Sequence, residues 1–384
     1  MIDVRAHLAR KPLLFDGGMG TYYKAKPGTE CEQGNLLDPA GVRKVHREYL
    51  AAGAEAIKTN TFGLPRMAAA RQPDWQVLAR AGWKLAAEAA VETGAAVFAD
   101  LGPAPDTEAA PAGSIYTAVA RCFVEQGAKN FLFETLSSDA GVLEAVQAVK
   151  AQVPDAFVLV SFAVLPDGYT REGMYSKDLV RRMTESGIVD AVGFNCVSAP
   201  GAMRTLVQQL GSTALPLSVM PNAGYPVVTR TQVKYQGKPE YFAKELARIA
   251  AEGVRILGGC CGTTPAHTAA LRAALDSLPA VEKAAPVVQV STPEAPTVEK
   301  DDAFLRKLNA GKKVIAIELD SPKDADLTNY LAGAKRLQAA GADLLTIADC
   351  PIARARMDSS LVACRVHREL GLCTLPHMTC RDRN

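Results

Sequence analysis

The sequence predicts an α/β protein, a (β/α)8 TIM barrel that is followed by a linker and a partial second α/β barrel segment. Eight apolar runs of strand length occur before residue 278, and their interiors are almost entirely apolar, as in parallel strands covered on both faces. Amphipathic helical patterns separate these runs. Eight even strand-then-helix units match a closed barrel, and they favour it over the alternative, a doubly wound open sheet.

The expected strands share an apolar interior and are, in chain order, Leu13–Asp16, Ala56–Thr61, Ala95–Leu101, Asn130–Thr135, Phe157–Ala163, Ala191–Cys196, Leu215–Pro221 and Arg255–Gly259. Amphipathic helices are expected between them, including Gly41–Ala52, Trp83–Val91 and Leu179–Met183. Two long connections, Thr21–Pro39 and Ala223–Pro239, follow the first and seventh strands. Loops in this position lie on the face where barrel enzymes keep their active sites.

The composition changes after residue 278. Residues 279–300 alternate proline with Ala, Val, Glu and Thr, which predicts a semi-extended linker. Residues 301–384 show three helix and three strand patterns, and they are Phe304–Leu308, Val314–Leu319, Leu327–Ala340, Asp343–Ala348, Ser359–Leu370 and Cys373–Leu375. Three strands are too few for a barrel, so we expect this segment to be the start of one that continues elsewhere.

Charge and hydrophobicity exclude several classes of partner. The chain has 384 residues and a net charge of +2, from 43 basic and 41 acidic side chains. This balance favours neither a nucleic acid nor a membrane surface. Residues 1–5 lack the pattern of a signal peptide, and no apolar stretch reaches the roughly 18 residues of a membrane span. A soluble cytoplasmic protein is therefore expected.

Three of the nine cysteines stand at expected strand ends. Cys196 ends the sixth strand, and Cys260 and Cys261 end the eighth. Because strand ends of a barrel converge on one mouth, the three thiols are expected to meet there. Three thiolates with one open position suit a catalytic zinc, whereas a structural site would need a fourth protein ligand. The alternatives are buried, inert cysteines or a vicinal disulfide.

A zinc site of this kind predicts thiol chemistry. Zinc lowers the pKa of a bound thiol, so that a thiolate exists at neutral pH. Three cysteine thiolates give the site a net negative charge, which keeps the bound sulfur electron-rich. Such a sulfur suits attack on a soft electrophile such as a methyl group, and the same site would activate water only weakly.

Several motifs follow one another along residues 5–278, and they are Asp16–Thr21 (DGGMGT), Thr59–Gly63 (TNTFG), Phe133–Thr135 (FET), Gly193–Cys196 (GFNC), Pro221–Gly224 (PNAG) and Gly258–Pro265 (GGCCGTTP). Together and in this order they resemble the homocysteine S-methyltransferase family, which includes the homocysteine domain of cobalamin-dependent methionine synthase and betaine–homocysteine methyltransferase. The last motif is quite specific. The resemblance implies a zinc-dependent enzyme of methionine biosynthesis.

The resemblance also implies a role for individual residues. Cys196, Cys260 and Cys261 would bind zinc, and Asn222 would occupy the fourth position when homocysteine is absent. The turn containing Asp16, Gly17, Gly18 and Met19 would present N–H groups to the substrate carboxylate, Glu134 would hold the substrate ammonium, and Asn60, Thr61 and Asn195 would complete the pocket.

Two of these roles have structural alternatives. Glu134 ends an apolar strand, where an unpaired carboxylate is costly, so it could instead form an ion pair with a lysine of the barrel. Asp16 could instead cap the following turn. Asn60 and Thr61 are expected to shape the pocket rather than to perform chemistry.

The methyl donor stays open at this point. Methyltetrahydrofolate, a methylated corrinoid protein, S-methylmethionine and betaine are all compatible with the sequence. Asp100–Pro103 and Leu64–Arg66 depart from the family pattern at the barrel mouth, where the donor would bind. No Asp-x-His-x-x-Gly pattern for cobalamin is present, so a corrinoid would have to bind elsewhere.

The segment after the linker has a resemblance of its own. Ala316–Pro322 (AIELDSP) and Pro376–Asn384 (PHMTCRDRN) resemble the start of methylenetetrahydrofolate reductase, a flavin-binding barrel. By this resemblance Glu318 would donate a proton to folate, and His377 and Thr379 would contact FAD. With three of eight strands, and with the remaining reductase portion missing, we expect no folate reduction. A bifunctional fragment and a non-catalytic thiol-binding or metal-binding barrel remain the alternative functions.

Overall fold

The computed structural model describes residues 2–107, 110–228, 233–235, 237–278, 303–349 and 356–378. The chain divides into two compact units, Met1–Val290 and Ser291–Asn384, which we describe separately. The expected linker at 279–300 and the expected flavin contact Thr379 lie outside the described residues.

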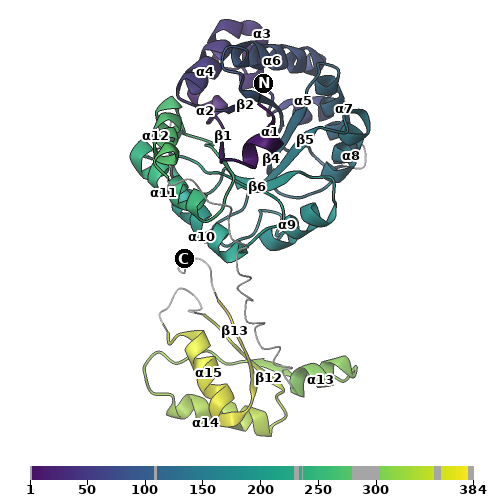
Figure 1. Cartoon of the computed structure of the whole chain (residues 1–384). Coiled ribbons are helices and arrows are strands. Elements are labelled where there is room, and N and C mark those ends of the chain that lie inside the picture. Colours follow the sequence, from purple (N-terminus) through teal and green to yellow (C-terminus); the bar gives the residue numbers. More distant parts are fainter. Residues whose placement is uncertain are drawn as a thin grey trace. The chain divides into compact units, whose positions relative to one another are not determined.

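The first unit is a ring of eight parallel strands, which confirms the predicted fold class (Figure 1). The ring follows chain order, because each strand pairs with the next and β10 pairs with β1. A parallel bridge between Phe15 and Ala56 joins β1 to β2 and completes the ring. The strands are β1 (Leu13–Leu14), β2 (Ala56–Lys58), β3 (Ala96–Leu101), β4 (Asn130–Leu136), β5 (Phe157–Phe162), β6 (Ala191–Asn195), β7 (Leu217–Met220) and β10 (Ile256–Leu257).

Helices surround the ring and bury one face each against it (Figure 1). They are α4 (Pro39–Ala51), α5 (Leu64–Ala69), α6 (Trp75–Ala90), α7 (Ala112–Val124), α8 (Val142–Gln152), α9 (Ser176–Glu185), α10 (Pro200–Leu210), α11 (Pro239–Ala251) and α12 (Pro265–Asp276). The three expected helices are present as α4, α6 and α9, and α6 begins eight residues earlier than expected. None of the helices in the described residues is long and apolar enough to cross a membrane.

Alternation of side chains along the strands divides the apolar core into two layers. The larger layer lies between strands and helices. The smaller layer fills the inside of the ring, and helix α1 (Val4–Leu8) packs against it with both of its terminal residues. Its strand residues are Leu13, Phe15, Ala56, Ala96, Phe98, Leu132, Phe157, Leu159, Ala191, Met220 and Ile256.

The same alternation places polar side chains at the carboxyl ends of the strands. Lys58, Asp100 and Glu134 each follow an inward-facing residue by two positions, and all three are buried. The inward-facing residues are Ala56, Phe98 and Leu132. The strand pattern therefore directs one cation and two carboxylates into the inner mouth of the barrel.

The two long connections near this mouth carry structure of their own. The connection after β1 contains α2 (Met19–Tyr22), η1 (Cys31–Gln33) and α3 (Gly34–Leu37). The connection after β7 contains an antiparallel hairpin of β8 (Pro226–Val228) and β9 (Val233–Tyr235).

The second unit is a three-stranded parallel sheet in the order β11 (Ala316–Glu318), β12 (Leu344–Ile347) and β13 (Cys373–Pro376). Its helices are α13 (Ala303–Asn309), α14 (Thr328–Ala339) and α15 (Ser359–Leu370). All six predicted elements are present. An apolar cluster that includes Leu345, Ile347 and Val362 forms its core.

Candidate functional site

Three cysteine sulfurs meet at the carboxyl ends of the barrel strands. Cys196 follows β6, and Cys260 and Cys261 follow β10. Their Sγ atoms all lie within 4.8 Å of one another, and those of Cys196 and Cys261 are 3.8 Å apart. Closure of the strand ring thus brings Cys196 close to Cys260 and Cys261 although they are far apart in sequence, as the argument from strand ends predicted. No other group of this kind occurs in the part of the chain that the structure describes.

The backbone after β7 connects the two cysteine segments. Cys196 N–H donates to Met220 O (3.1 Å), and Cys260 N–H donates to Pro221 O (2.9 Å). The N–H of Ala223 donates in turn to Cys261 O (2.9 Å). Because all three bonds start or end on one short segment, the three thiols are fixed relative to one another by backbone geometry.

At two positions near the sulfurs the backbone geometry is one that few residue types tolerate. Cys196 has a φ of +58°, in the left-handed region that is costly for a residue other than glycine. A Cβ on Gly18 would lie 2.6 Å from the carbonyl oxygen of Cys260, so only glycine allows this close approach. Strain and close packing of this kind persist where the surrounding structure holds a functional site.

The donor set fits a thiophilic metal ion. Hydrogen bonds from Cys196 and Cys260 lower the pKa of the Cys261 thiol, whereas its bonds to Cys196 and Cys261 raise the pKa of Cys260. The thiols therefore share protons that a cation would displace. Asn222 offers a further oxygen, because its buried Oδ1 accepts no hydrogen bond and its neighbours Pro221 and Ala223 bond to the cysteine backbone.

The sulfurs border a cavity of about 270 Å³. Of the residues predicted from sequence, its wall contains the three cysteines with Gly18, Met19, Asn60, Thr61 and Glu134. Asp16, Gly17, Asn195 and Asn222 do not line it. Gly20 and Thr21, which belong to the expected turn Asp16–Thr21, also line it. Residues of the wall that the sequence analysis did not propose as site residues are Cys31, Glu32, Lys58, Thr59, Phe62, Asp100 and Thr135.

The Glu134 carboxylate contacts one neutral side chain, Asn195, and one charged side chain, Lys58. Its Oε2 accepts a hydrogen bond from Asn195 Nδ2 (3.1 Å) and lies 3.6 Å from Lys58 Nζ. The ion pair with a barrel lysine, which the sequence left open as an alternative, is thus present. It does not use up the carboxylate, which has about four acceptor sites.

Asn195 is fully buried and its side-chain amide is fully engaged. Oδ1 accepts from Thr135 N–H (2.8 Å) and Ser161 Oγ (2.9 Å), and Nδ2 donates to Glu134 and to Thr135 Oγ1 (2.7 Å). The same nitrogen lies 4.0 Å from Cys260 Sγ. Asn195 therefore connects the carboxylate to the sulfur cluster from behind the wall of the cavity.

Asn60 and Thr61 use their polar atoms within the protein. Asn60 Nδ2 donates to Cys31 O (2.8 Å) and to Asn35 Oδ1 (2.9 Å), and its Oδ1 accepts from Cys31 Sγ (3.1 Å). Thr61 Oγ1 donates to Asp100 O (2.8 Å). The contacts of Asn60 attach the connection after β1 to the barrel, and the contact of Thr61 attaches the segment after β2 to β3, so both residues shape the pocket.

The buried ionisable groups at the mouth of the barrel shift one another's pKa values. Burial raises the pKa of Asp16 to about 7, against the opposing charge of Lys58, and Asp16 Oδ2 accepts from the Lys58 N–H (3.0 Å). Burial likewise raises the pKa of Asp100 well above its ordinary value. Lys58 and Asp100 were missed as site residues from sequence, although the argument used for Glu134, a charge ending an apolar strand, applies equally to both.

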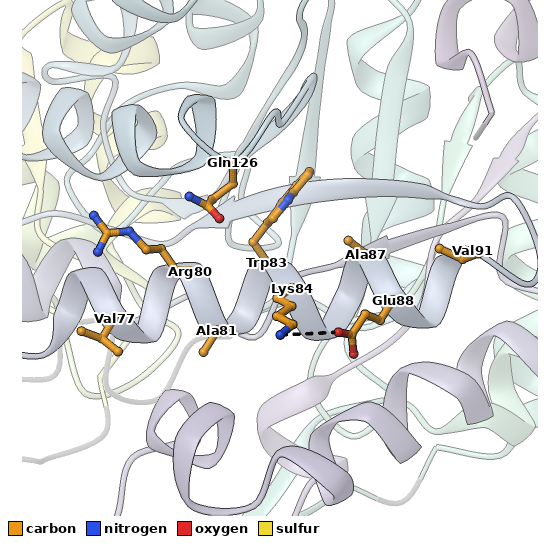
Figure 2. A pocket seen from close by; sticks show the side chains of 9 residues that line it. All are labelled: Val77, Arg80, Ala81, Trp83, Lys84, Ala87, Glu88, Val91 and Gln126. Carbon is orange, nitrogen blue, oxygen red and sulfur yellow. Dashed lines mark ion pairs between the residues drawn. The ribbon is translucent and has the colours of Figure 1, made fainter.

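A larger depression of about 520 Å³ lies on the outer surface along α6 (Figure 2). It is lined by Val77, Arg80, Ala81, Trp83, Lys84, Ala87, Glu88, Val91 and Gln126. The charged side chains of Lys84 and Glu88 pair with each other at 3.9 Å within one helix turn. The one cluster of three potential metal ligands among the described residues lies elsewhere, at the strand ends, so the smaller cavity there is the candidate site.

Two residues expected to serve folate reduction, Glu318 and His377, lie in the second unit. Glu318 ends β11, and His377 follows β13, with its N–H donating to Ile347 O (2.9 Å). Strand β12 separates the two strands.

The profile of one protein family, homocysteine S-methyltransferase, matches residues 13–275. Methionine synthase of Mycobacterium tuberculosis is 31% identical over 312 residues, which cover 74% of this chain and 26% of that protein. The chain thus spans about a quarter of that relative. Homocysteine S-methyltransferase of Escherichia coli is 29% identical over 297 residues, covering 68% of this chain and 94% of the relative.

Solved structures give the same fold. The metallated form of the homocysteine methyltransferase MmuM from Escherichia coli superposes with a TM-score of 0.57 at 24% identity, covering 70% of this chain and 99% of that one. Its apo form gives a TM-score of 0.55 at 26% identity, covering 71% and 99%.

Proposed function

The chain belongs to the homocysteine S-methyltransferase family, and we propose that its barrel transfers a methyl group to the sulfur of homocysteine and releases methionine. The observation that carries the proposal is the meeting of three cysteine sulfurs, within 4.8 Å, at a cavity lined by buried charged side chains. We assign this activity to residues 1–278, with 279–300 as a linker and 301–384 as an incomplete reductase-like segment.

Zinc is the metal that we propose for the three cysteines. A zinc ion bound there would lower the pKa of the substrate thiol and leave its sulfur electron-rich. Cys196, Cys260 and Cys261 would hold it as thiolates, and the unpaired Oδ1 of Asn222 is the oxygen available when no thiol is bound. We propose a cytoplasmic location, where such thiols stay reduced, and Cys196, Cys260 and Cys261 form no disulfide.

The protein's own groups would orient the amino acid. Glu134, held by Asn195 and facing the cavity, is the proposed partner of the substrate ammonium. Desolvation at this depth strengthens such a charge-assisted contact. The link from Glu134 through Asn195 to Cys260 would keep the ammonium site and the sulfur site at a fixed separation.

The test is an assay of methionine formation from homocysteine with a panel of methyl donors, run on the full chain after its zinc content is measured. The panel holds methyltetrahydrofolate, a methylcorrinoid, S-methylmethionine and betaine. One zinc per chain, with methionine formed from at least one donor and lost in Cys260→Ser, is the expected result. Full activity in a metal-free protein would overturn the zinc proposal, and zinc without turnover on any donor would point to a binding barrel.

A further inference from the structure

Lys58 is a buried ammonium whose hydrogen-bonding capacity is barely used. It stands at the end of β2, lines the cavity, and its side chain is 6% exposed. Its polar neighbours are Gly259 O at 3.5 Å and Glu134 Oε2 at 3.6 Å. An ammonium has three N–H donors, and charge-assisted bonds ordinarily measure about 2.7–2.9 Å. Lys58 therefore has donors to offer to a ligand.

The amine stays charged despite its burial. Burial lowers the pKa of Lys58, but the carboxylates of Glu134 and Asp16 more than compensate, so its pKa lies above the ordinary value. A buried cation that is only loosely paired is costly. An anionic ligand that reached it would remove part of this cost.

Acceptor capacity for a cation faces the same cavity. Glu134, which lines the cavity with Lys58, accepts one bond from Asn195 and has capacity for more. The site thus combines free donors on a cation with free acceptor sites on a carboxylate, which is the pattern that complements a zwitterion.

The position of Lys58 relates this pattern to the sulfurs. Its amine contacts the carbonyl of Gly259, the residue before the proposed metal ligand Cys260. Glu134 reaches the same cysteine through Asn195. Both charges therefore lie near Cys260, in the wall of the cavity that the sulfurs border.

We propose that Lys58 binds the α-carboxylate of the methyl-accepting amino acid, while Glu134 beside it binds the α-ammonium. This inference rests on the proposed function and names a substrate contact within it. It differs from the role that the family resemblance gives to the turn at Asp16–Thr21. In that turn the N–H of Gly18 already donates to Thr263 Oγ1 at 3.0 Å.

A competing role gives a different pattern of binding. If Lys58 only neutralised Glu134, its loss would weaken every ligand that carries an ammonium. If Lys58 binds the carboxylate, its loss weakens only ligands that carry a carboxylate. Two fragments of homocysteine separate these cases, because 3-aminopropane-1-thiol lacks the carboxylate and 4-mercaptobutanoate lacks the ammonium.

The experiment is calorimetric binding of homocysteine and both fragments to the zinc-loaded full chain, as wild type, Lys58→Met and Lys150→Met. Lys150 pairs with Asp190 at 2.7 Å, away from the cavity, and serves as the matched control. We expect Lys58→Met to weaken homocysteine and 4-mercaptobutanoate by about 10- to 100-fold, as for a lost charged hydrogen bond, and to leave 3-aminopropane-1-thiol within about threefold. Lys150→Met should change none of the three.

Equal weakening of 3-aminopropane-1-thiol in Lys58→Met would overturn the inference, and so would unchanged homocysteine binding. If wild type binds zinc but not homocysteine, the proposed function fails and the inference fails with it. If Lys58→Met does not fold, Lys58→Arg and wild type decide the matter. Both should prefer homocysteine to 3-aminopropane-1-thiol by at least about tenfold, and a wild type without this preference would overturn the inference.

Discussion

The side-chain nitrogen of Asn195 lies 3.1 Å from Glu134 Oε2, so an amide at the end of β6 holds a carboxylate at the end of β4. Strand β5 separates these two strands in the sheet. The contact therefore spans the inside of the barrel and fixes a buried charge at its mouth. Asn195 thus contacts a residue of the cavity wall without lining the cavity itself.

We expect Asn195→Ala to weaken both the fold and substrate binding. Loss of the amide removes the acceptor of Thr135 N–H and Ser161 Oγ, which costs about 1–3 kcal/mol of stability per unsatisfied group, and leaves Glu134 with Lys58 alone. A displaced Glu134 should raise the KM for homocysteine about tenfold or more. Kinetics and thermal unfolding measure the two effects.

The control for this variant is Asn130→Ala. Asn130 is buried at the opposite end of β4 and donates to Val97 O at 3.2 Å. Its loss should lower stability to a similar degree and leave the KM for homocysteine unchanged. An unchanged KM in Asn195→Ala would show that Glu134 does not depend on this amide.

Removal of metal should destabilise the barrel specifically. If zinc binds the folded cysteine cluster, free zinc at about 100 times its Kd stabilises the fold by about 2.7 kcal/mol. The chelator-treated protein should therefore unfold at a lower temperature, and added zinc should restore it. Both tryptophans of the chain lie in α6, so their fluorescence reports on the first unit alone.

Two cysteine variants separate the metal effect from general damage. Cys260→Ser should make the unfolding temperature insensitive to the chelator. Cys122→Ser should keep the sensitivity, because Cys122 is a buried residue of α7 that belongs to the outer core layer. A chelator effect of equal size in Cys260→Ser would contradict zinc binding at the cluster.

Most of the fold could be predicted because its signals are local. The eight apolar runs correspond to the eight strands of the ring, and their continuous burial is what makes them recognisable. The strand limits were less accurate, since β1 and β10 have two residues each where the apolar runs suggested four or five. The short helices α2, η1 and α3 were not predicted, because they have only four, three and four residues and lack a periodic pattern.

The candidate site was predictable only in part. The cysteines stood out because their spacing and flanking glycines are rare, and Glu134 stood out because a charge ends an apolar run. Lys58 and Asp100 are also charged residues near the ends of apolar runs. Whether their side chains reach the cavity depends, however, on which face of the strand is turned inward. That choice is made by the closure of the ring, which no short stretch of sequence contains.

The raised pKa of Asp16 predicts a loss of stability as the pH rises. In the unfolded chain this carboxyl ionises near 3.8, whereas in the fold it ionises near 7. Between these values the folded state binds more protons than the unfolded state, so its stability falls with increasing pH. The full effect, above pH 7, is about 4 kcal/mol at most.

Asp16→Asn isolates this contribution, because an asparagine can still accept the N–H of Lys58 and cannot ionise. The difference in unfolding free energy between variant and wild type should favour the variant increasingly from about pH 4 to pH 7, followed by tryptophan fluorescence in denaturant. A difference that is constant with pH would show that Asp16 stays ionised throughout.

His46 predicts the opposite dependence in the same pH range. It is fully buried in α4, neither ring nitrogen has a hydrogen-bond partner, and burial lowers its pKa to about 4. In the unfolded chain the imidazole binds a proton below a pH of about 6.5, whereas in the folded protein it binds one only below about 4. Stability is therefore lost as the pH falls from about 6.5 to 4, by up to about 3 kcal/mol.

His46→Leu removes this titrating group. Between pH 6.5 and 5 the free energy of unfolding should fall less in His46→Leu than in wild type. If His46→Leu and wild type lose stability in parallel on acidification, His46 is protonated in the fold and must have a partner.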